Sequence, residues 1–413
     1  MDEFYRIRRL PPYVFEQVNR AKAMARSAGA DIIDLGMGNP DLPAPAHVIE
    51  KMKETLGKSR TDRYSSSRGV PGLRRAQAAY YARRFGVKLN PDTQVVATLG
   101  SKEGFANVAQ AITAPGDVVL VPDPSYPIHA FGFLMAGGVI RSVPSDPTPD
   151  FFAILERAIT HSIPKPIAVV VCYPSNPTAH VADLDFYKEL VPFAKKHGIF
   201  ILSDLAYAEV YFDNNPPPSV LQVPSAMDLC VEFTSMSKTY SMPGWRIGFA
   251  VGNERIIAAL SRVKSYLDYG AFTPIQVAAT AALNGPQDCI VEARNTYKER
   301  RDVLIEGLSA AGWNLPEPSA SMFAWAPIPK EFAELGSLAF SKLLLTQANV
   351  AVSPGIGFGE HGDAHVRIAL VENKHRIRQA IRNIRQVMAD PGRAIDLYLR
   401  GVGDNITPLK ARA

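Results

Sequence analysis

The segment Leu229-Cys230-Val231-Glu232-Phe233-Thr234-Ser235-Met236-Ser237-Lys238 passes from a predicted strand directly into a serine-rich turn. Its first six residues are mostly apolar, which is typical of a buried strand. Similar runs occur at Asp117–Val121, Ile167–Val171 and Phe200–Leu202, and helical patterns such as Leu184–Lys196 separate them. Continuous apolar strands that alternate with helices predict an α/β fold built on a mostly parallel sheet.

Polar side chains follow the ends of these predicted strands. In parallel sheets, ligands bind beyond the carboxyl ends of the strands, which all lie at one edge. The residues that the sequence places at this edge are Tyr126, Asn176, Asp204, Tyr207 and Lys238. Their convergence predicts a binding site and indicates more than any one of these residues does alone.

The turn after the last strand combines one lysine with hydroxyl groups and an arginine. Ser235 and Ser237 precede Lys238, and Arg246 follows in a turn between Gly244 and Gly248. Lysine forms Schiff bases with aldehydes, while hydroxyls and a guanidinium bind phosphate. An aldehyde with a phosphate group points to pyridoxal 5′-phosphate (PLP). Taken alone, a lysine in such a loop is more often a solvated surface residue.

A second phosphate-type pattern lies earlier in the chain. A strand at Gln94–Leu99 is followed by the turn Gly100–Gly104 and a predicted helix at Phe105–Ile112. The start of a helix presents free N–H groups and a positive dipole end, so Ser101 and Lys102 are candidate phosphate-binding residues. The pattern is neither a Walker A loop nor a G-x-G-x-x-G motif, and an ordinary capped turn is the alternative.

The remaining edge residues have roles that suit a pyridine ring. Asp204 could hold the proton of the ring nitrogen through its charge, although an isolated Asp after a strand is otherwise more often a helix N-cap. Asn176 and Tyr207 could donate to the ring 3-oxygen, while the prolines around Asn176 equally suit a plain turn. Tyr126 could stack on the ring or pack in the core.

Composition limits the class of protein. The chain has 413 residues, 47% apolar and 21% charged, which fits a globular protein of about two domains. A net charge of +5 with scattered basic residues predicts no nucleic-acid partner. No apolar run reaches the ~20 residues of a membrane span, and no signal peptide is apparent. Three widely spaced cysteines show no metal-type spacing. We therefore expect a cytoplasmic protein without a metal site.

The pattern changes along the chain and predicts two domains. A large domain is expected at 47–287, and residues 1–46 with 288–390 are expected to form a smaller α+β domain. The latter contains a strand pair at Val350–Val352 and His365–Leu370. Residues 391–413 are expected to be a tail without an assigned element.

Taken together, the motifs resemble those of fold type I, class I/II PLP-dependent aminotransferases, from about Arg8 to Met388. The motifs that carry the resemblance are Gly38-Asn39-Pro40-Asp41, Tyr64, Ser101-Lys102-Glu103, Ser125-Tyr126-Pro127, Ser175-Asn176-Pro177-Thr178, Asp204-x-x-Tyr207, Ser235-x-Ser237-Lys238, Gly244-Trp245-Arg246-Ile247-Gly248 and His365-Val366-Arg367. The resemblance implies a large domain with a mostly parallel sheet and a smaller α+β domain.

The resemblance also implies a role for each matching residue. Lys238 would bind the cofactor as a Schiff base and move the substrate proton, and Asp204 would pair with the ring nitrogen. Asn176 and Tyr207 would bond the 3-oxygen, and Tyr126 would stack on the ring. The phosphate would be held by Ser101, Lys102, Ser235, Ser237 and Arg246. Tyr64 would reach the phosphate of a neighbouring subunit in a homodimer with shared active sites. Arg367 would bind the substrate carboxylate, assisted by Gly38 and Asn176.

Within the family, the chain is most similar to bacterial glutamate–pyruvate (alanine) aminotransferases, through segments such as Arg9–Phe15 and Lys264–Gly270. This implies ping-pong transfer between an L-amino acid, alanine, and a 2-oxo acid, 2-oxoglutarate. Tyr13 is a candidate for the side-chain pocket, and Arg68 is a candidate partner for the second carboxylate of glutamate. The alternatives are another specificity (aspartate, aromatic or LL-diaminopimelate), a β-eliminating lyase, or a non-catalytic sensor.

Overall fold

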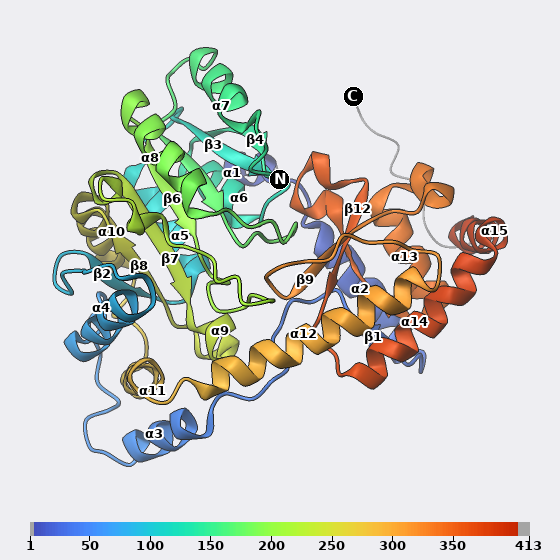
Figure 1. The fold of residues 1–413 in the computed structure, drawn as a ribbon, viewed down its shortest axis with the longest axis horizontal. Helices are drawn as coiled ribbons and strands as arrows, with labels where there is room; N and C mark the ends of the chain where they lie inside the picture. The colour runs from blue at the N-terminus through green and yellow to red at the C-terminus, as the bar shows by residue number, and fades with distance from the viewer. Residues whose placement is uncertain (1–3, 404–413) are drawn as a thin grey trace. The chain divides into compact units, whose positions relative to one another are not determined.

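The computed structural model describes residues 4–403 and divides into two compact units (Figure 1). The described part of the first unit comprises residues 39–296 with the segments 4–11 and 319–321, and the second comprises 12–38, 297–318 and 322–403. The predicted domain boundaries stay a prediction, because a division by contacts within one chain does not test whether the parts fold or move as domains.

A seven-stranded sheet forms the centre of the first unit, in the order β2-β8-β7-β6-β5-β3-β4. Its strands are β2 (Val95–Thr98), β3 (Val118–Asp123), β4 (Val139–Pro144), β5 (Ala168–Cys172), β6 (Phe200–Asp204), β7 (Cys230–Ser235) and β8 (Gly248–Gly252). The pairs from β4 across to β7 are parallel, whereas β8 is antiparallel to both β7 and β2. The predicted α/β class with a mostly parallel sheet is confirmed.

Helices cover both faces of this sheet, because successive strand residues point to opposite sides. Val96 belongs to one core cluster with residues of α5 (Ser101–Ile112), α6 (Ile128–Ala136) and α10 (Glu254–Leu267). Val95 belongs to the other, on the opposite face. The helices that contribute to that cluster include α3 (Ala46–Leu56), α4 (Pro71–Phe85), α7 (Phe151–Thr160), α8 (Leu184–His197) and α11 (Thr273–Asn284). Burial on both faces explains why these strands read as continuous apolar runs.

The second unit is built on smaller sheets. An antiparallel sheet has the order β11-β12-β9, and a short parallel pair joins β1 to β10. These strands are β1 (Ile33–Asp34), β9 (Phe323–Pro327), β10 (Val350–Ala351), β11 (Ser353–Pro354) and β12 (His365–Ala369). The expected pairing of the Val350 and His365 strands is therefore wrong, since β12 pairs with β9 and β11 while β10 pairs with β1.

Helices complete the described chain. Those of the second unit are α2 (Val14–Ser27), α13 (Gly336–Ala348), α14 (Lys374–Ala389) and α15 (Pro391–Gly403), and α12 (Asp288–Ser309) contains the boundary between the units. The short elements are α1 (Tyr5–Arg8), α9 (Met236–Thr239), η1 (Val220–Gln222), η2 (Ala226–Asp228), η3 (Pro243–Trp245), η4 (Lys330–Leu335), η5 (Gly355–Phe358) and η6 (Glu360–Gly362). The region after residue 390, for which the sequence assigned no element, contains α15, and the rest of the predicted tail, 404–413, lies outside the described residues.

Two strands of the large sheet were not predicted. β4 lies at the edge of the sheet and is mostly exposed or half-buried, so it lacks an apolar run. β8 is fully buried but short and has glycine at both ends, a composition more typical of a turn. In addition, α5 begins at Ser101, four residues before the predicted start, so the expected phosphate turn is the first turn of the helix itself.

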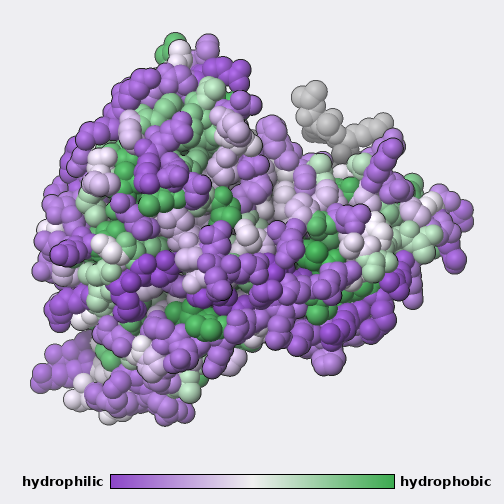
Figure 2. All heavy atoms as spheres, viewed as in Figure 1, coloured by the Kyte–Doolittle hydropathy of each residue, from purple (hydrophilic) through white to green (hydrophobic). Residues whose placement is uncertain are grey.

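The surface in view is mainly hydrophilic, with separate hydrophobic patches (Figure 2). Within residues 4–403, no helix combines the length and the apolar character that crossing a membrane requires.

Candidate active site

The carboxyl edge of the large sheet carries the residues that the sequence placed there. Cys172 at the end of β5 pairs in register with Asp204 at the end of β6, and Asp204 in turn pairs with Phe233 near the end of β7. Because the strands are parallel and in register, the segments that follow them start from the same edge. Asn176, Asp204 and Tyr207 are buried, and Lys238 is half-buried.

Asp204 is held by two contacts that leave its carboxylate oriented. Its Oδ2 lies 2.9 Å from Nε2 of His129, and its Oδ1 accepts a hydrogen bond of 3.1 Å from the backbone N–H of Ala206. His129 is fully buried, and its ring packs on Phe105 and edge-on to Tyr126. Among the described residues, Nδ1 of His129 has no hydrogen-bond partner. This histidine orients the carboxylate expected to face the cofactor ring.

The sequence reasoning missed His129. It lies three residues after Tyr126 in the first turn of an apolar helix, and a histidine there gives no pattern of its own. Its ring, the Cys172 thiol and the Asp204 carboxylate place three possible metal ligands within 4.8 Å of one another. Burial raises the pKa of the Cys172 thiol well above its ordinary range, which opposes formation of the thiolate that a metal would require.

The start of α5 forms a cradle with the arginine turn. Arg246 donates from Nη2 to the Leu99 carbonyl (3.0 Å) and from Nη1 to the Pro243 carbonyl (2.7 Å). Gly100 has φ +86°, and a Cβ atom there would collide with the Arg246 guanidinium. A Cβ on Gly248 would lie 2.9 Å from the backbone N of Ser101. The absence of these two Cβ atoms lets the guanidinium and the free helix N–H groups approach one another, as a phosphate site requires.

The lysine turn is held by local hydrogen bonds. Ser235 ends β7, and its Oγ accepts from the backbone N–H of Ser237 at 3.2 Å. Thr239 donates to the Ser235 carbonyl at 3.3 Å, which closes the single turn of α9. Lys238 lies in this turn, with Nζ 5.9 Å from the centre of the Tyr207 ring. Nζ of Lys102 lies at the same distance, 5.9 Å, from the centre of the Tyr126 ring.

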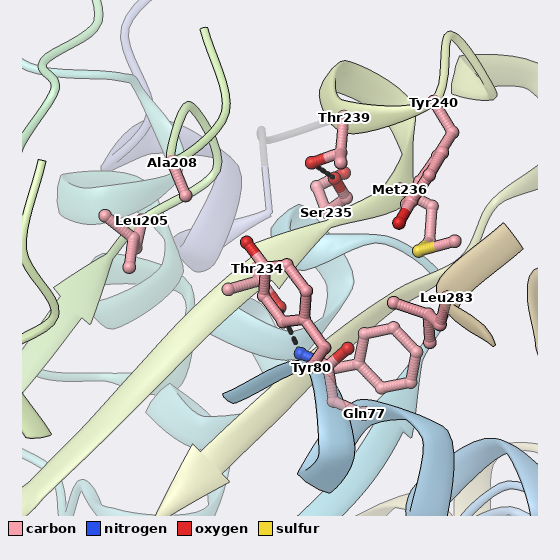
Figure 3. A pocket seen from close by; sticks show the side chains of 11 residues that line it. Gln77, Tyr80, Leu205, Ala208, Thr234, Ser235, Met236, Thr239, Tyr240 and Leu283 are labelled. Atoms are coloured by element: carbon pink, nitrogen blue, oxygen red, sulfur yellow. Dashed lines mark hydrogen bonds between the residues drawn. The ribbon is translucent and has the colours of Figure 1, made fainter. Parts of the chain in front are cut away.

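A small cavity lies next to the turn that carries Lys238 (Figure 3). Its lining includes Tyr80 and Gln77 of α4, Leu283 of α11 and the segment Thr234–Met236. Gln77 donates to the Thr234 hydroxyl at 3.0 Å across it. The space open to a water-sized sphere is about 10 Å³, the lower limit for one water molecule. It is too small for a pyridine ring and is not the cofactor site.

Tyr64 lies on the surface of the first unit. It is 86% exposed, and its ring centre lies 4.6 Å from that of Tyr269. Gln276, which is fully buried, donates to the Ser65 hydroxyl and to the Ala271 carbonyl and so ties the two tyrosine-bearing loops together. The exposed rings of Tyr64 and Tyr269 thus lie on loops that the hydrogen bonds of Gln276 hold in place.

Arg68 has a partner that the sequence did not suggest. Its Nη2 donates to the carbonyl of Asp92, just before β2, and its main-chain carbonyl accepts from Ala97 N at 3.0 Å. Desolvation and the nearby Arg74 lower the pKa of the Arg68 guanidinium. Asp92 precedes β2, whereas the proposed phosphate turn follows that strand.

In the second unit, Arg367 of β12 is held between aromatic faces. Its Cζ lies 4.0 Å from the ring centre of Phe323 and 4.7 Å from that of Phe358. Nη2 donates to the Gly36 carbonyl at 2.9 Å. A Cβ on Gly38 would lie 2.7 Å from Phe323, so glycine is needed beside this guanidinium. A cation fixed in this way is suited to bind a carboxylate.

Tyr13, a predicted substrate residue, belongs to the same unit. It is half exposed, and its ring packs edge-on to Phe15. Burial raises the pKa of the Tyr13 hydroxyl, and the positive charge of Arg367 acts in the opposite direction. The phenol therefore stays protonated at neutral pH and is available as a hydrogen-bond donor.

Comparison with known families now bears on this geometry. The family described as aminotransferase class I and II matches residues 30–384. The chain belongs to this family. Its members use PLP, and the residues found here fit that cofactor: a lysine beside a phenol, a buried carboxylate, and a guanidinium beside a helix N-terminus at Gly100 and Gly248. The protein is a PLP-dependent aminotransferase.

Individual relatives agree with the family assignment. A Rhizobium meliloti (strain 1021) protein that carries the aminotransferase name AatC is 72% identical over 389 residues, 94% of this chain and 96% of that protein. Glutamate-pyruvate aminotransferase AlaC of Escherichia coli (strain K12) is 51% identical, over 94% of each chain. LL-diaminopimelate aminotransferase of Moorella thermoacetica (strain ATCC 39073 / JCM 9320) is 42% identical, over 94% of this chain and 99% of that protein.

The fold is also found in solved structures. The structure of substrate-bound BacF from Bacillus subtilis is similar with a TM-score of 0.89 and 34% identity. The similarity covers 94% of this chain and 98% of that one. The aminotransferase assignment excludes the sensor alternative as the sole role of the chain.

Proposed function

We propose that this aminotransferase transfers the amine of L-alanine to 2-oxoglutarate by a ping-pong mechanism. The observation that supports this pair is the 51% identity to the glutamate-pyruvate aminotransferase of Escherichia coli over 94% of each chain. The 42% identity to LL-diaminopimelate aminotransferases makes that specificity the second candidate. Other specificities and β-elimination on the same cofactor are the remaining alternatives.

When bound, PLP supplies the electron-withdrawing ring that makes removal of the substrate Cα proton possible. We assign the movement of that proton to Nζ of Lys238. Asp204, oriented by His129, would hold the proton on the ring nitrogen through its negative charge. We assign Asn176 and Tyr207 as the donors that would bind the ring 3-oxygen, and Tyr126 as the aromatic side chain that would stack on the ring.

The phosphate end is assigned to the cradle at the start of α5. Ser101 and Lys102 contribute backbone N–H groups, Ser235 and Ser237 contribute hydroxyls, and Arg246 contributes its guanidinium. This position is supported by the close approach of Arg246 to Gly100 and of Ser101 to Gly248. None of these groups moves a proton, so the role of the cradle is binding and orientation.

We assign recognition of the substrate α-carboxylate to Arg367. The guanidinium is held by Phe323 and Phe358, which restrict its rotation before substrate arrives. Gly38 keeps the space beside it clear, while Asn176 and the phenol of Tyr13 are assigned as further substrate donors. A fixed, bidentate donor favours the planar carboxylate that all amino acids and 2-oxo acids share.

A homodimer with shared active sites completes the proposal. Tyr64 and Tyr269 are exposed on a polar base, and Tyr266, Leu267 and Phe272 are exposed nearby in the sequence. Large exposed aromatic residues are typical of interface centres. We place Tyr64 against the cofactor phosphate of the partner subunit. A cytoplasmic location stays a prediction from the sequence, and cell fractionation tests it.

Steady-state kinetics tests the substrate assignment. We expect 2-oxoglutarate to accept the amine from alanine with a higher kcat/KM than from LL-diaminopimelate or aspartate, with parallel double-reciprocal lines that identify ping-pong transfer. A higher kcat/KM for LL-diaminopimelate would overturn the alanine assignment. Release of ammonia and pyruvate without an acceptor would favour the β-elimination alternative instead.

A further inference from the structure

Lys264 of α10 is a buried cation that the mechanism above does not use. Its side chain is 0% exposed, and Nζ lies 2.9 Å from Oε1 of Glu103 and 2.9 Å from Oδ2 of Asp268. A fully buried lysine is rare and requires paired charges, because removing an ammonium from water costs several kcal/mol. With two carboxylates and one ammonium, the group carries a net charge of −1.

Glu103 connects this group to the proposed phosphate cradle. It is the third residue of α5, and its Oε2 accepts a hydrogen bond of 2.8 Å from the backbone N–H of Leu99, next to Gly100. Its Oε1 also accepts from Asn107, one turn further along the helix. The carboxylate therefore fixes the chain where the helix begins. Its negative charge would also repel a phosphate dianion bound at Ser101.

Asp268 holds the ammonium from the other side. Its Oδ1 accepts from the backbone N–H of Gly270 at 2.6 Å, and its main-chain carbonyl accepts from the Ser67 hydroxyl. Tyr269 lies between Asp268 and Gly270 in the sequence, and its ring packs on that of Tyr64. The ammonium is therefore anchored to the tyrosine loops and cannot turn away from Glu103 without losing this contact.

We propose that Lys264 is a positioning residue for the cofactor phosphate: it neutralises Glu103, so that this carboxylate can fix the start of α5 without repelling the phosphate. The inference rests on the proposed phosphate site at Ser101 and Arg246. Lys264 does not touch the cofactor. It acts through the charge of Glu103 and through the geometry of the Leu99–Ser101 turn.

Equilibrium binding to the apoenzyme provides the test, with PLP and pyridoxal as two probes that differ only in the phosphate. Lys264→Met leaves Glu103 unpaired and should weaken PLP binding by about tenfold, but pyridoxal binding by less than about twofold. The double variant Glu103→Gln/Lys264→Met has no unneutralised carboxylate at the start of α5 and should recover PLP affinity to within about threefold. Lys188→Met, which removes an exposed ion pair with Asp185, should change neither value.

Three outcomes would overturn the inference: unchanged PLP affinity in Lys264→Met, an equal loss for PLP and pyridoxal, or no recovery in the double variant. If Lys264→Met alone does not fold, Glu103→Gln and the double variant are compared instead. The PLP affinities of these two variants should then differ by less than about twofold. A larger loss in the double variant for PLP, but not for pyridoxal, would contradict the proposal. Arg246→Met distinguishes a failure of the proposed phosphate site from a failure of the role proposed for Lys264. If Arg246→Met leaves PLP affinity unchanged, the proposed phosphate site itself is wrong.

Discussion

Among the charged side chains of the candidate site, Asp204 is placed where little water screens its charge. Asp204 is buried, and His129 and the backbone N–H of Ala206 fix both of its oxygens. A carboxylate held in this way attracts a proton on a facing ring nitrogen by roughly 4 kcal/mol at an effective dielectric constant near 20. We expect the orientation supplied by His129 to contribute less to activity than the charge of Asp204 does.

Asp204→Asn should therefore lower kcat/KM for transamination by on the order of a thousandfold, since the ring nitrogen loses its counter-charge. His129→Asn, which keeps the carboxylate but removes its orienting imidazole, should lower kcat/KM by about tenfold. Steady-state kinetics of both variants, saturated with PLP, measures the two effects. An equal loss in both would show that orientation and not charge is decisive.

Arg68 offers a second prediction at this scale. If its guanidinium leaves the Asp92 carbonyl to bind the distal carboxylate of glutamate, Arg68→Ala should raise KM for glutamate by about tenfold and spare alanine. If Arg68 only ties the Asp92 segment to the loop before α4, both substrates should be affected equally. Comparing kcat/KM for the two amino donors separates these outcomes.

Among the elements, β7 carries both the lysine turn and a buried acid. Glu232 lies fully buried in this strand and accepts hydrogen bonds from Tyr81, Ser219, Ser203 and the backbone N–H of Val220. Four donors converge on one carboxyl group and fix β7 against α4 and η1. Desolvation nevertheless raises the pKa of Glu232 above its ordinary value of 4.5.

This raised pKa gives stability a predictable pH dependence. An acid with a raised pKa in the folded protein contributes its full stability below pH 4.5 and loses it as the pH rises through the folded-state value. The free energy of unfolding of the wild type, minus that of Glu232→Gln, should thus fall as the pH rises above 4.5. Urea unfolding at several pH values measures it.

Glu54→Gln is the matched control. Hydrogen bonds from Lys51 and Lys58 lower the pKa of this exposed acid to about 2, so Glu54 is ionised in both states above pH 5. The difference in free energy of unfolding between wild type and Glu54→Gln should therefore stay constant above pH 5. A constant difference for Glu232→Gln as well would show that its pKa is not raised in the folded protein.

At the scale of the whole molecule, the proposed dimer makes two chains necessary for one site. Tyr64 is exposed in a single chain, and in the proposed dimer it serves the partner's phosphate. Large exposed aromatic side chains lose their contact with water when two copies associate, which favours association through the hydrophobic effect.

Hybrid dimers test this directly. Tyr64→Ala and Lys238→Ala homodimers should both be impaired, the second almost completely. A mixed dimer would contain one site with the lysine of one chain and the tyrosine of the other, both unaltered. Random mixing should therefore restore up to about a quarter of wild-type activity. If the mixture shows only the average of the two homodimers, Tyr64 acts within its own chain or not at all.

The positions of several candidate site residues at one edge of the sheet could be predicted, because these residues lie at or after strand ends. Asp204 is the last residue of β6 and Lys238 lies in the turn after β7, and a parallel sheet brings such positions to one edge whatever the helices between them do. His129 and Lys264 could not be found in this way. His129 lies on an apolar helix and Lys264 on an amphipathic one, and their partners, Asp204 and Glu103, are 75 and 161 residues away.

Local patterns of apolar and polar residues were enough to predict the strands β2, β3, β5, β6 and β7, the turn that carries Lys238, and the family. Only the tertiary structure decided the antiparallel insertion of β8, the pairing of β12 with β9 and β11, and the partners of the buried charges. The difference lies in how far apart in the sequence the interacting residues are. Apolar periodicity acts over a few residues, whereas strand order and ion pairing arise when distant segments lose water together.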